Sequence, residues 1–212
     1  TDAAVHAAGR RHAVAGLDLG ARAARRDQAL REPAFRVVMA RNIEIKARVD
    51  DLDALAARTA AIATDGPIEI AQDDTFFSCT GGRLKLRAFS AAEGELIFYQ
   101  RADRAGPKES FYLRTPTTDP AGLREVLRLA IGIVGRVVKR RTLYLIGRTR
   151  MHLDRVEGLG AFMELEVVLT DGESSEAGVA EAHALMARLE IATDRLVEAA
   201  YVDLLRAAES PR

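Results

Sequence analysis

Polar and apolar residues alternate strictly in the stretch Asn42-Ile43-Glu44-Ile45-Lys46-Ala47-Arg48. Isoleucine and alanine occupy every second position, and an amide, an acid and two bases occupy the others. Successive side chains of a strand point to opposite sides, so this pattern predicts a strand with one apolar and one ionic face. Later stretches repeat the arrangement. The sequence therefore predicts a sheet with one strongly charged face.

Further strands are expected after the first, which runs over about Asn42–Val49. They are separated by turn signals such as Gly81-Gly82 and Gly158-Leu159-Gly160. The expected strands cover residues 68–74, 75–79, 83–87, 96–101, 110–115, 137–145, 149–156 and 162–169. Residues 102–109 contain Gly106-Pro107 and are expected to form an exposed loop.

Helices are expected at four places, because apolar residues there recur at helical spacing and Asp or Pro precedes two of them. The second should turn Leu123, Val126, Leu127 and Ala130 inward. The four ranges are 52–63, 120–131, 174–189 and 194–208.

Short turns between about eight strands favour an antiparallel sheet that closes on itself, since closure removes exposed edges. We therefore predict an α+β fold: an eight-stranded antiparallel β-barrel, or tunnel, with helices packed on its outside. Residues 39–208 should form this single domain. Residues 1–38, rich in Ala, Arg and Gly, are expected to be a disordered extension before Met39, with an Arg-rich targeting peptide as the alternative.

Composition narrows the class of protein. The 212 residues are 48% hydrophobic, 29% charged and 5% aromatic, with a formal net charge of zero. Few aromatics and no net positive charge disfavour nucleic-acid binding. The single cysteine excludes an intramolecular disulfide and a cysteine zinc site. Apolar runs are too short to span a membrane. We expect a cytoplasmic protein without a nucleic-acid or membrane partner.

The ionic faces would line the inside of the barrel if the alternation holds. Inward charges are costly unless they are paired or bind a ligand, and the expected bases outnumber the acids. Arginine and lysine bind phosphate oxygens, whereas carboxylates among them would repel phosphate unless Mg²⁺ or Mn²⁺ bridged the two. The pattern thus indicates a site for a metal ion and a triphosphate.

These residues resemble a known family. The stretch Asn42–Lys46 is similar to the ExExK signature of the CYTH, or triphosphate tunnel metalloenzyme, superfamily. The resemblance extends over about residues 40–206 with the motifs in family order. The further matching segments are Gly82–Arg87, Tyr99–Arg101, Gly106–Ser110, Val138–Arg141, Arg150–Asp154 and Phe162–Glu166.

The resemblance and the charged faces assign roles to individual residues. The implied metal ligands for Mg²⁺ or Mn²⁺ are Glu44, Glu164 and Glu166. Lys46, Lys108 and Asp154 are candidate catalytic residues, with Lys108 on a loop over the tunnel mouth. The candidate phosphate-binding residues are Lys46, Arg48, Arg83, Lys85, Arg87, Arg101, Lys139, Arg141 and Arg150.

Two residues qualify this assignment. Asn42 stands where the family has its first glutamate, so one negative charge is missing, which disfavours an arrangement with two metal ions. His152 has no second histidine at metal-ligand spacing, so we expect a hydrogen-bonded structural role for it rather than that of a general base.

The resemblance implies an enzyme acting on a nucleoside or inorganic triphosphate. A homodimer is a candidate assembly that the sequence does not decide. The Gly-Pro-Lys-x-Ser segment at Gly106–Ser110 favours a class IV adenylate cyclase, which converts ATP to cyclic AMP and pyrophosphate. Hydrolysis of tripolyphosphate or thiamine triphosphate is the alternative. A polyphosphate-binding module that lost turnover with the change at Asn42 is a third hypothesis.

Overall fold

The computed structural model describes residues 38–101 and 106–209. The extension expected over residues 1–38 therefore lies outside the described residues, except that Val38 already belongs to the first strand. The strands are β1 Val38–Arg48, β2 Asp65–Phe77, β3 Arg83–Ser90, β4 Glu93–Arg101, β5 Lys108–Thr117, β6 Ile133–Ile146, β7 Thr149–Val156 and β8 Gly160–Val168. The helices are α2 Leu52–Ala60, α3 Pro120–Ile131, α4 Ser175–Arg188 and α5 Tyr201–Glu209, with a 3₁₀ turn, η1, at Thr193–Arg195.

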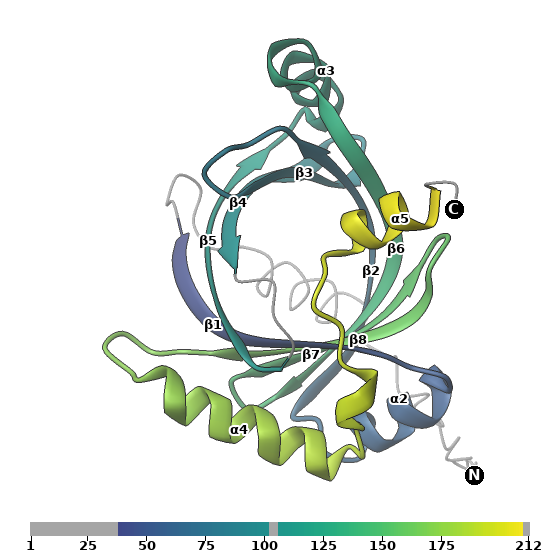
Figure 1. Ribbon diagram of the computed structural model, residues 1–212, viewed down its shortest axis with the longest axis vertical. Helices are drawn as coiled ribbons and strands as arrows, with labels where there is room; N and C mark the ends of the chain where they lie inside the picture. Colours follow the sequence, from purple (N-terminus) through teal and green to yellow (C-terminus); the bar gives the residue numbers. More distant parts are fainter. Residues whose placement is uncertain (1–37, 102–105, 210–212) are drawn as a thin grey trace, which may run out of the picture. The chain divides into compact units, whose positions relative to one another are not determined.

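In the described part of the chain, the eight strands form a closed antiparallel barrel in the order β1-β5-β4-β3-β2-β6-β7-β8. Pairing of β1 with both β5 and β8 closes the ring, which Figure 1 shows end on. The predicted α+β fold with helices outside a barrel is confirmed. The two strands expected at 68–74 and 75–79 are one continuous strand, β2.

A smaller hydrophobic cluster that includes Phe76, Phe162 and Tyr201 lies on the inner strand face, but the larger cluster lies outside the barrel, between its outer face and helices α2 and α4. Ile43, Ile45 and Ala47 of β1 are all but fully buried there. They belong to a cluster that includes Leu55 of α2 and Leu185 of α4. The apolar side chains of β1 thus pack against the helices, and its charged side chains point into the barrel.

Helix α3 differs from its expected packing. Asp119 caps it as predicted by accepting a hydrogen bond from the Gly122 amide at 2.8 Å, and Pro120 in the first turn is buried. Val126 and Ala130, expected to face inward, are instead exposed, Val126 by 62%. The first half of the helix is tied to the sheet, because Arg124 donates to Asp73 of β2 at 3.1 Å, while its far end projects beyond the sheet (Figure 1).

The C-terminal helix expected at 194–208 is also different. Only α5, from Tyr201, is α-helical, and residues 196–200 form no helix. Leu196 forms a β-bridge with Ala47, and the Val197 amide donates to the Lys46 carbonyl at 2.9 Å. Hydrogen bonding to the barrel wall therefore replaces the helical turns predicted by periodicity, and the segment crosses the face of the ring shown in Figure 1.

No helix among the described residues is long and apolar enough to cross a membrane.

Candidate active site

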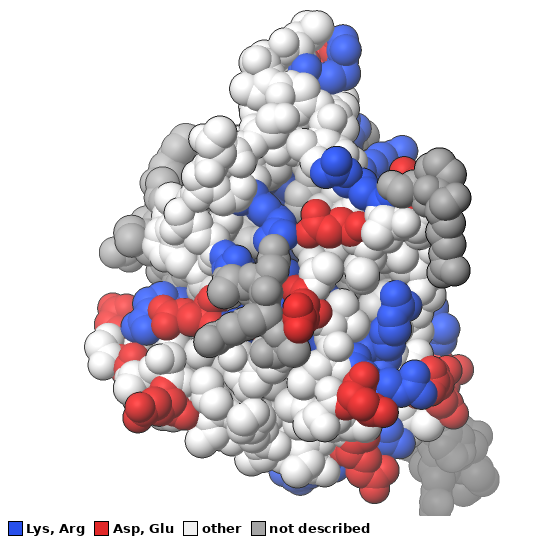
Figure 2. All heavy atoms as spheres, in the orientation of Figure 1, with Lys and Arg blue, Asp and Glu red and all other residues white. Residues whose placement is uncertain are grey.

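The inner face of the barrel carries charged residues in register across β1, β8 and β7. Glu44 lies opposite Glu166, and Lys46 lies opposite Glu164. Glu164 in turn lies opposite His152 on β7. Residues directly opposite in an antiparallel pair share a face. The charged residues of these three strands therefore form one shared ionic surface. Figure 2, which looks onto the end of the barrel, shows basic side chains near the middle of that end.

Asp154 on β7 is completely buried and binds two bases. It accepts hydrogen bonds from Lys139 at 2.9 Å and from two guanidinium nitrogens of Arg141 at 2.7 Å each. The Tyr201 hydroxyl also donates to it, at 3.1 Å. Burial alone would raise the pKa of Asp154, but Arg141 and Lys139 outweigh burial and hold the pKa below its ordinary value. Asp154 is therefore ionised at neutral pH and positions these two bases.

Glu164 on β8 occupies the neighbouring place on the inner face. Arg141 donates to its carboxylate, and the Lys46 amine lies 3.3 Å from it. Burial opposes ionisation here too, yet Lys139, Lys46 and Arg141 hold the pKa of Glu164 well below its ordinary value. Asp154 and Glu164 thus share three buried bases.

A second cluster on β2 and β3 centres on Asp74, a residue that the sequence analysis missed. Asp74 accepts from Lys85 at 2.9 Å and from two nitrogens of Arg87 at 2.8 and 2.9 Å. Splitting β2 into two strands at this position concealed the signal, because Gln72, Asp74 and Phe76 alternate inward only along one continuous strand. The two phosphate-binding candidates Lys85 and Arg87 are therefore held by one buried carboxylate.

The remaining inner charges form pairs nearer the start of β7. Arg101 binds Glu44, and the Arg150 Nε lies 3.2 Å from a Glu166 carboxylate oxygen. Arg150 also donates to the Tyr112 hydroxyl at 3.2 Å. Glu44, predicted as a metal ligand, is thus bound by a guanidinium group.

Three predicted site residues have unexpected surroundings. Lys108 is not on an exposed loop: it begins β5, faces Glu44 inside the barrel, and is 1% exposed. Its amine donates to the Glu198 carbonyl at 3.1 Å, because a buried ammonium group needs an acceptor. The other two are Arg83, which binds Asp203 of α5 at 2.8 Å, and Arg48, which is exposed and stacks over Phe162.

Tyr201 connects the C-terminal segment to the charged interior. Its ring packs edge-on against Phe162, with centroids 5.0 Å apart. The Lys46 amine lies 4.1 Å from the ring centroid, a cation–π distance, and also donates to the Ala199 carbonyl at 3.2 Å. The segment before α5 therefore supplies acceptors for lysines of the site.

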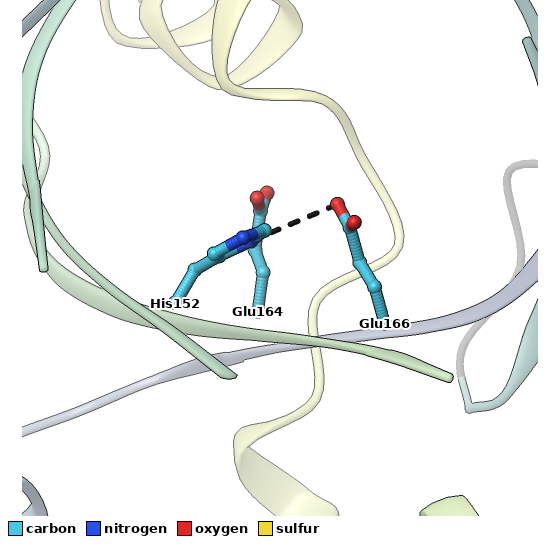
Figure 3. Close-up of side chains that lie close together, drawn as sticks. All are labelled: His152, Glu164 and Glu166. Atoms are coloured by element: carbon cyan, nitrogen blue, oxygen red, sulfur yellow. Dashed lines mark ion pairs between the residues drawn. The ribbon is translucent and has the colours of Figure 1, made fainter. Parts of the chain in front are cut away.

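One group of side chains could hold a metal ion. His152 on β7 and Glu164 and Glu166 on β8 point into the barrel side by side (Figure 3). One ligand atom from each lies within 4.8 Å of the other two. Carboxylate oxygens are the ligands that Mg²⁺ and Mn²⁺ prefer, so this donor set fits the divalent ion that the sequence implied.

His152 differs from its expected hydrogen-bonded role. Its Nδ1 atom is buried, has no hydrogen-bond partner among the described residues, and lies 3.7 Å from a Glu166 oxygen. Burial and the charge of Arg141 hold the pKa of His152 well below 6.5, so the imidazole is neutral at neutral pH. A neutral ring leaves one nitrogen lone pair available to a ligand.

The arrangement as a whole brings together most of the predicted site residues: Glu44, Lys46, Lys85, Arg87, Arg101, Lys108, Lys139, Arg141, Arg150, Asp154, Glu164 and Glu166. Fixed cations beside oxygen ligands can bind a polyanion together with a divalent ion and stabilise charge that develops on phosphate oxygens.

Comparison with known proteins gives a family match. Residues 40–201 match the model of the CYTH domain. No curated protein sequence matches the chain.

Solved structures share the fold. The PH1012 protein from Pyrococcus horikoshii OT3 is 24% identical with a TM-score of 0.68, over 77% of this chain and 99% of that one. A putative adenylate cyclase from Vibrio parahaemolyticus is 20% identical with a TM-score of 0.61, over 78% and 97% of the two chains. A putative adenylyl cyclase from Hippeastrum, described as having a dominant triphosphatase activity, is 18% identical with a TM-score of 0.56, over 80% and 97%.

Proposed function

Because the chain belongs to the CYTH domain family, we propose that it is an enzyme that binds a triphosphate inside its barrel and, with a divalent metal ion, catalyses a reaction at phosphorus. The chemistry of the inner face supports this proposal. The family match and the barrel give the family and the fold. The substrate and the reaction are inferred from the residues of the inner face.

The observation that carries the proposal is the excess of bases over carboxylates among the buried and partly buried ion pairs of the inner face. Three carboxylates, Asp74, Asp154 and Glu164, are shared by five bases. An excess of buried cations is costly unless an anion balances it. A triphosphate supplies that charge, and its spaced oxygens suit bases fixed on several strands. The five bases are Lys46, Lys85, Arg87, Lys139 and Arg141.

In this mechanism the bases bind and orient the phosphate chain. Asp154 holds Lys139 and Arg141 in fixed positions before substrate arrives, so little reorganisation accompanies the reaction. Preorganised cations stabilise the charge that develops on the phosphate oxygens in the transition state. The metal ion, bound by Glu164 and Glu166 with His152 beside them, would supply further charge neutralisation on those oxygens.

The first candidate reaction is adenylate cyclisation, in which the ribose 3′-oxygen of ATP attacks the α-phosphorus and pyrophosphate leaves. The motif resemblance favours this reaction, and a structural neighbour from Vibrio parahaemolyticus is described as a putative adenylate cyclase. Here the bases would hold the leaving pyrophosphate.

The second candidate is hydrolysis, in which water attacks the terminal phosphorus. The position of Lys108 differs from the one that the cyclase resemblance implied, because this lysine donates to the Glu198 carbonyl inside the barrel instead of lying over its mouth. The Hippeastrum neighbour, described as mainly a triphosphatase, agrees with this alternative.

Product analysis separates the candidates. The full chain would be incubated with ATP, tripolyphosphate or thiamine triphosphate, each with Mg²⁺ or Mn²⁺. Cyclic AMP with pyrophosphate would identify a cyclase, and release of orthophosphate would identify a hydrolase. Absence of any product, together with binding of tripolyphosphate, would leave a polyphosphate-binding module and refute the enzymatic proposal.

A variant at the metal group provides the matched test. Glu166→Gln keeps the shape of the side chain but removes its charge, so we expect turnover to fall by at least about 100-fold, since electrostatic groups at a reacting centre contribute that much. Glu109→Gln is the control, because Glu109 is half exposed and pairs with Arg41. Equal activity of both variants would remove Glu166 from the site.

A further inference from the structure

The imidazole of His152 is placed as a ligand rather than as a packing residue. It is 6% exposed and faces the barrel interior from β7, directly opposite Glu164. Its Nδ1 atom has no hydrogen-bond partner in the described part of the chain. A buried nitrogen without a partner costs free energy, so it indicates a ligand that the protein itself does not provide.

The two carboxylates beside it define which kind of ligand fits. Oxygens of Glu164 and Glu166 lie within 4.8 Å of each other and of a His152 ring nitrogen, and all three side chains point the same way (Figure 3). Two anionic oxygens beside a nitrogen attract a cation rather than a phosphate. Arg141 and Arg150 bind these same carboxylates, so a metal ion would have to compete with them for the oxygens.

We propose that His152 supplies a nitrogen ligand to the metal ion held by Glu164 and Glu166, and that this mixed site binds Mn²⁺ in preference to Mg²⁺. Mg²⁺ takes oxygen ligands almost exclusively, whereas transition-metal ions accept imidazole together with carboxylates. The inference rests on the proposed function only in assuming that a divalent ion enters the barrel. It goes beyond it by naming a nitrogen donor and the preferred ion.

Pulsed electron paramagnetic resonance of Mn²⁺ bound to the full chain, without any substrate, tests the ligand directly. A coordinated imidazole nitrogen couples its ¹⁴N nucleus to the Mn²⁺ electron spins. We expect this coupling in the unmodified chain, its change to a ¹⁵N pattern when histidine is ¹⁵N-labelled, and its loss in His152→Ala. Bound Mn²⁺ without nitrogen coupling, or no bound Mn²⁺, would overturn the proposal.

The chain offers matched controls, since it has four histidines: His6, His12, His152 and His183. His183→Ala changes an exposed residue of α4 and should keep the coupling. A variant with His6, His12 and His183 all replaced by alanine leaves only His152. It should keep the coupling too, which tests the assignment even if His152→Ala fails to fold. Loss of the signal in this triple variant would overturn it.

Competition between metals tests the stated preference. Binding titrations with Mn²⁺ and Mg²⁺ on the unmodified chain should give the higher affinity for Mn²⁺. In His152→Ala the Mn²⁺ affinity should fall at least about tenfold while that for Mg²⁺ changes little. If His152→Ala lost affinity for both ions equally, or if the unmodified chain bound Mg²⁺ more tightly, His152 would not be the source of the metal preference. Because neither measurement uses turnover, a failure of the enzymatic proposal would be seen separately.

Discussion

Asn42 is buried on β1, and its side-chain oxygen has no hydrogen-bond partner among the described residues. It lies on the same strand face as Glu44 and Lys46. A carboxylate at this position would add a negative charge beside the ion pairs that these two residues already form. The residue thus sets how much anionic charge is available to a metal ion near β1.

Asn42→Glu tests whether the missing negative charge limits the rate of turnover. If the natural chain is mainly a polyphosphate binder, turnover should rise steeply in the variant while affinity for tripolyphosphate changes little. If the natural chain is already an efficient enzyme, we expect turnover to change by less than about tenfold, because its metal group is complete without residue 42. Steady-state kinetics and isothermal titration on both proteins provide the measurement, with Asn42→Gln as the uncharged control.

Lys85 gives the candidate site a pH dependence. Burial and the neighbouring Arg87 lower the pKa of Lys85 to about 8, against the opposing effect of Asp74. Below that pH the amine is charged and can bind phosphate. Between about 8 and 10.5 the folded chain binds fewer protons than the unfolded chain, so this group makes the free energy of unfolding rise with pH over that window.

Triphosphate affinity should therefore fall as pH rises through 8, by at most about tenfold per pH unit, because binding then requires Lys85 to take up a proton. Titration of tripolyphosphate between pH 7 and 9.5 measures this fall. Lys85→Arg keeps its charge throughout the range, so the fall should be smaller in that variant. An identical pH profile for both proteins would show that Lys85 does not bind the phosphates.

At the scale of elements, α4 and β1 approach very closely at Gly178. A Cβ atom there would lie 2.6 Å from a Leu169 methyl and 2.7 Å from Ile43 Cγ1. The close approach allows α4 to cover the apolar face of β1, which in turn fixes the ionic face of the same strand toward the interior. Packing outside the barrel thus positions the site inside it.

Gly178→Ala should destabilise the protein by about 1–2 kcal/mol, because overpacking outweighs the helix-propensity gain of up to about 1 kcal/mol. Urea unfolding monitored by circular dichroism measures the change. Ala184→Gly changes an exposed position of α4, so it alters helix propensity without altering packing. It should lower the free energy of unfolding by about 1 kcal/mol. If Gly178→Ala were instead stabilising, the contact with Ile43 would not be tight.

The C-terminal segment shows how an element changes when its polar groups find tertiary partners. The Glu198 and Ala199 carbonyls accept hydrogen bonds from Lys108 and Lys46. In a continuous helix these carbonyls would bond along the helix axis instead. The buried ammonium groups of Lys108 and Lys46 therefore favour a non-helical segment here, and α5 begins only after it.

At the scale of the whole molecule, the barrel concentrates cations in its interior while the formal net charge of the chain is zero. A bound polyanion should therefore stabilise the fold. At a concentration of 100 times its dissociation constant a ligand adds about 2.7 kcal/mol, which for a chain of this size raises the melting temperature by roughly 5–10 °C.

Thermal unfolding with and without tripolyphosphate, in chelator to remove metals, measures this stabilisation. Lys46→Ala should reduce the shift by at least half, because it removes a base from the interior. Arg155→Ala is the matched control: Arg155 is exposed, lies outside the barrel and pairs with Asp53. Equal shifts in the two variants would show that the polyanion binds elsewhere.

The alternation of β1, β6, β7 and β8 was sufficient to predict a closed antiparallel barrel with an ionic interior, because strand side chains alternate whatever their neighbours are. The same rule placed Glu164, Lys139 and Arg141 on the inner face. Helical periodicity was less reliable. It predicted that Val126 faces inward, whereas this side chain is exposed because α3 extends past the sheet.

The sequence by itself thus determined the barrel, the face of each strand and the residue types that line the interior, since these depend on local periodicity. Only the tertiary structure decided the partners: Asp74 between Lys85 and Arg87, Lys108 inside the barrel against Glu198, and His152 beside Glu164 and Glu166. The physical reason is that pairing depends on strand register and on closure of the ring, which bring together residues far apart in the chain and leave no trace in the pattern of any one strand.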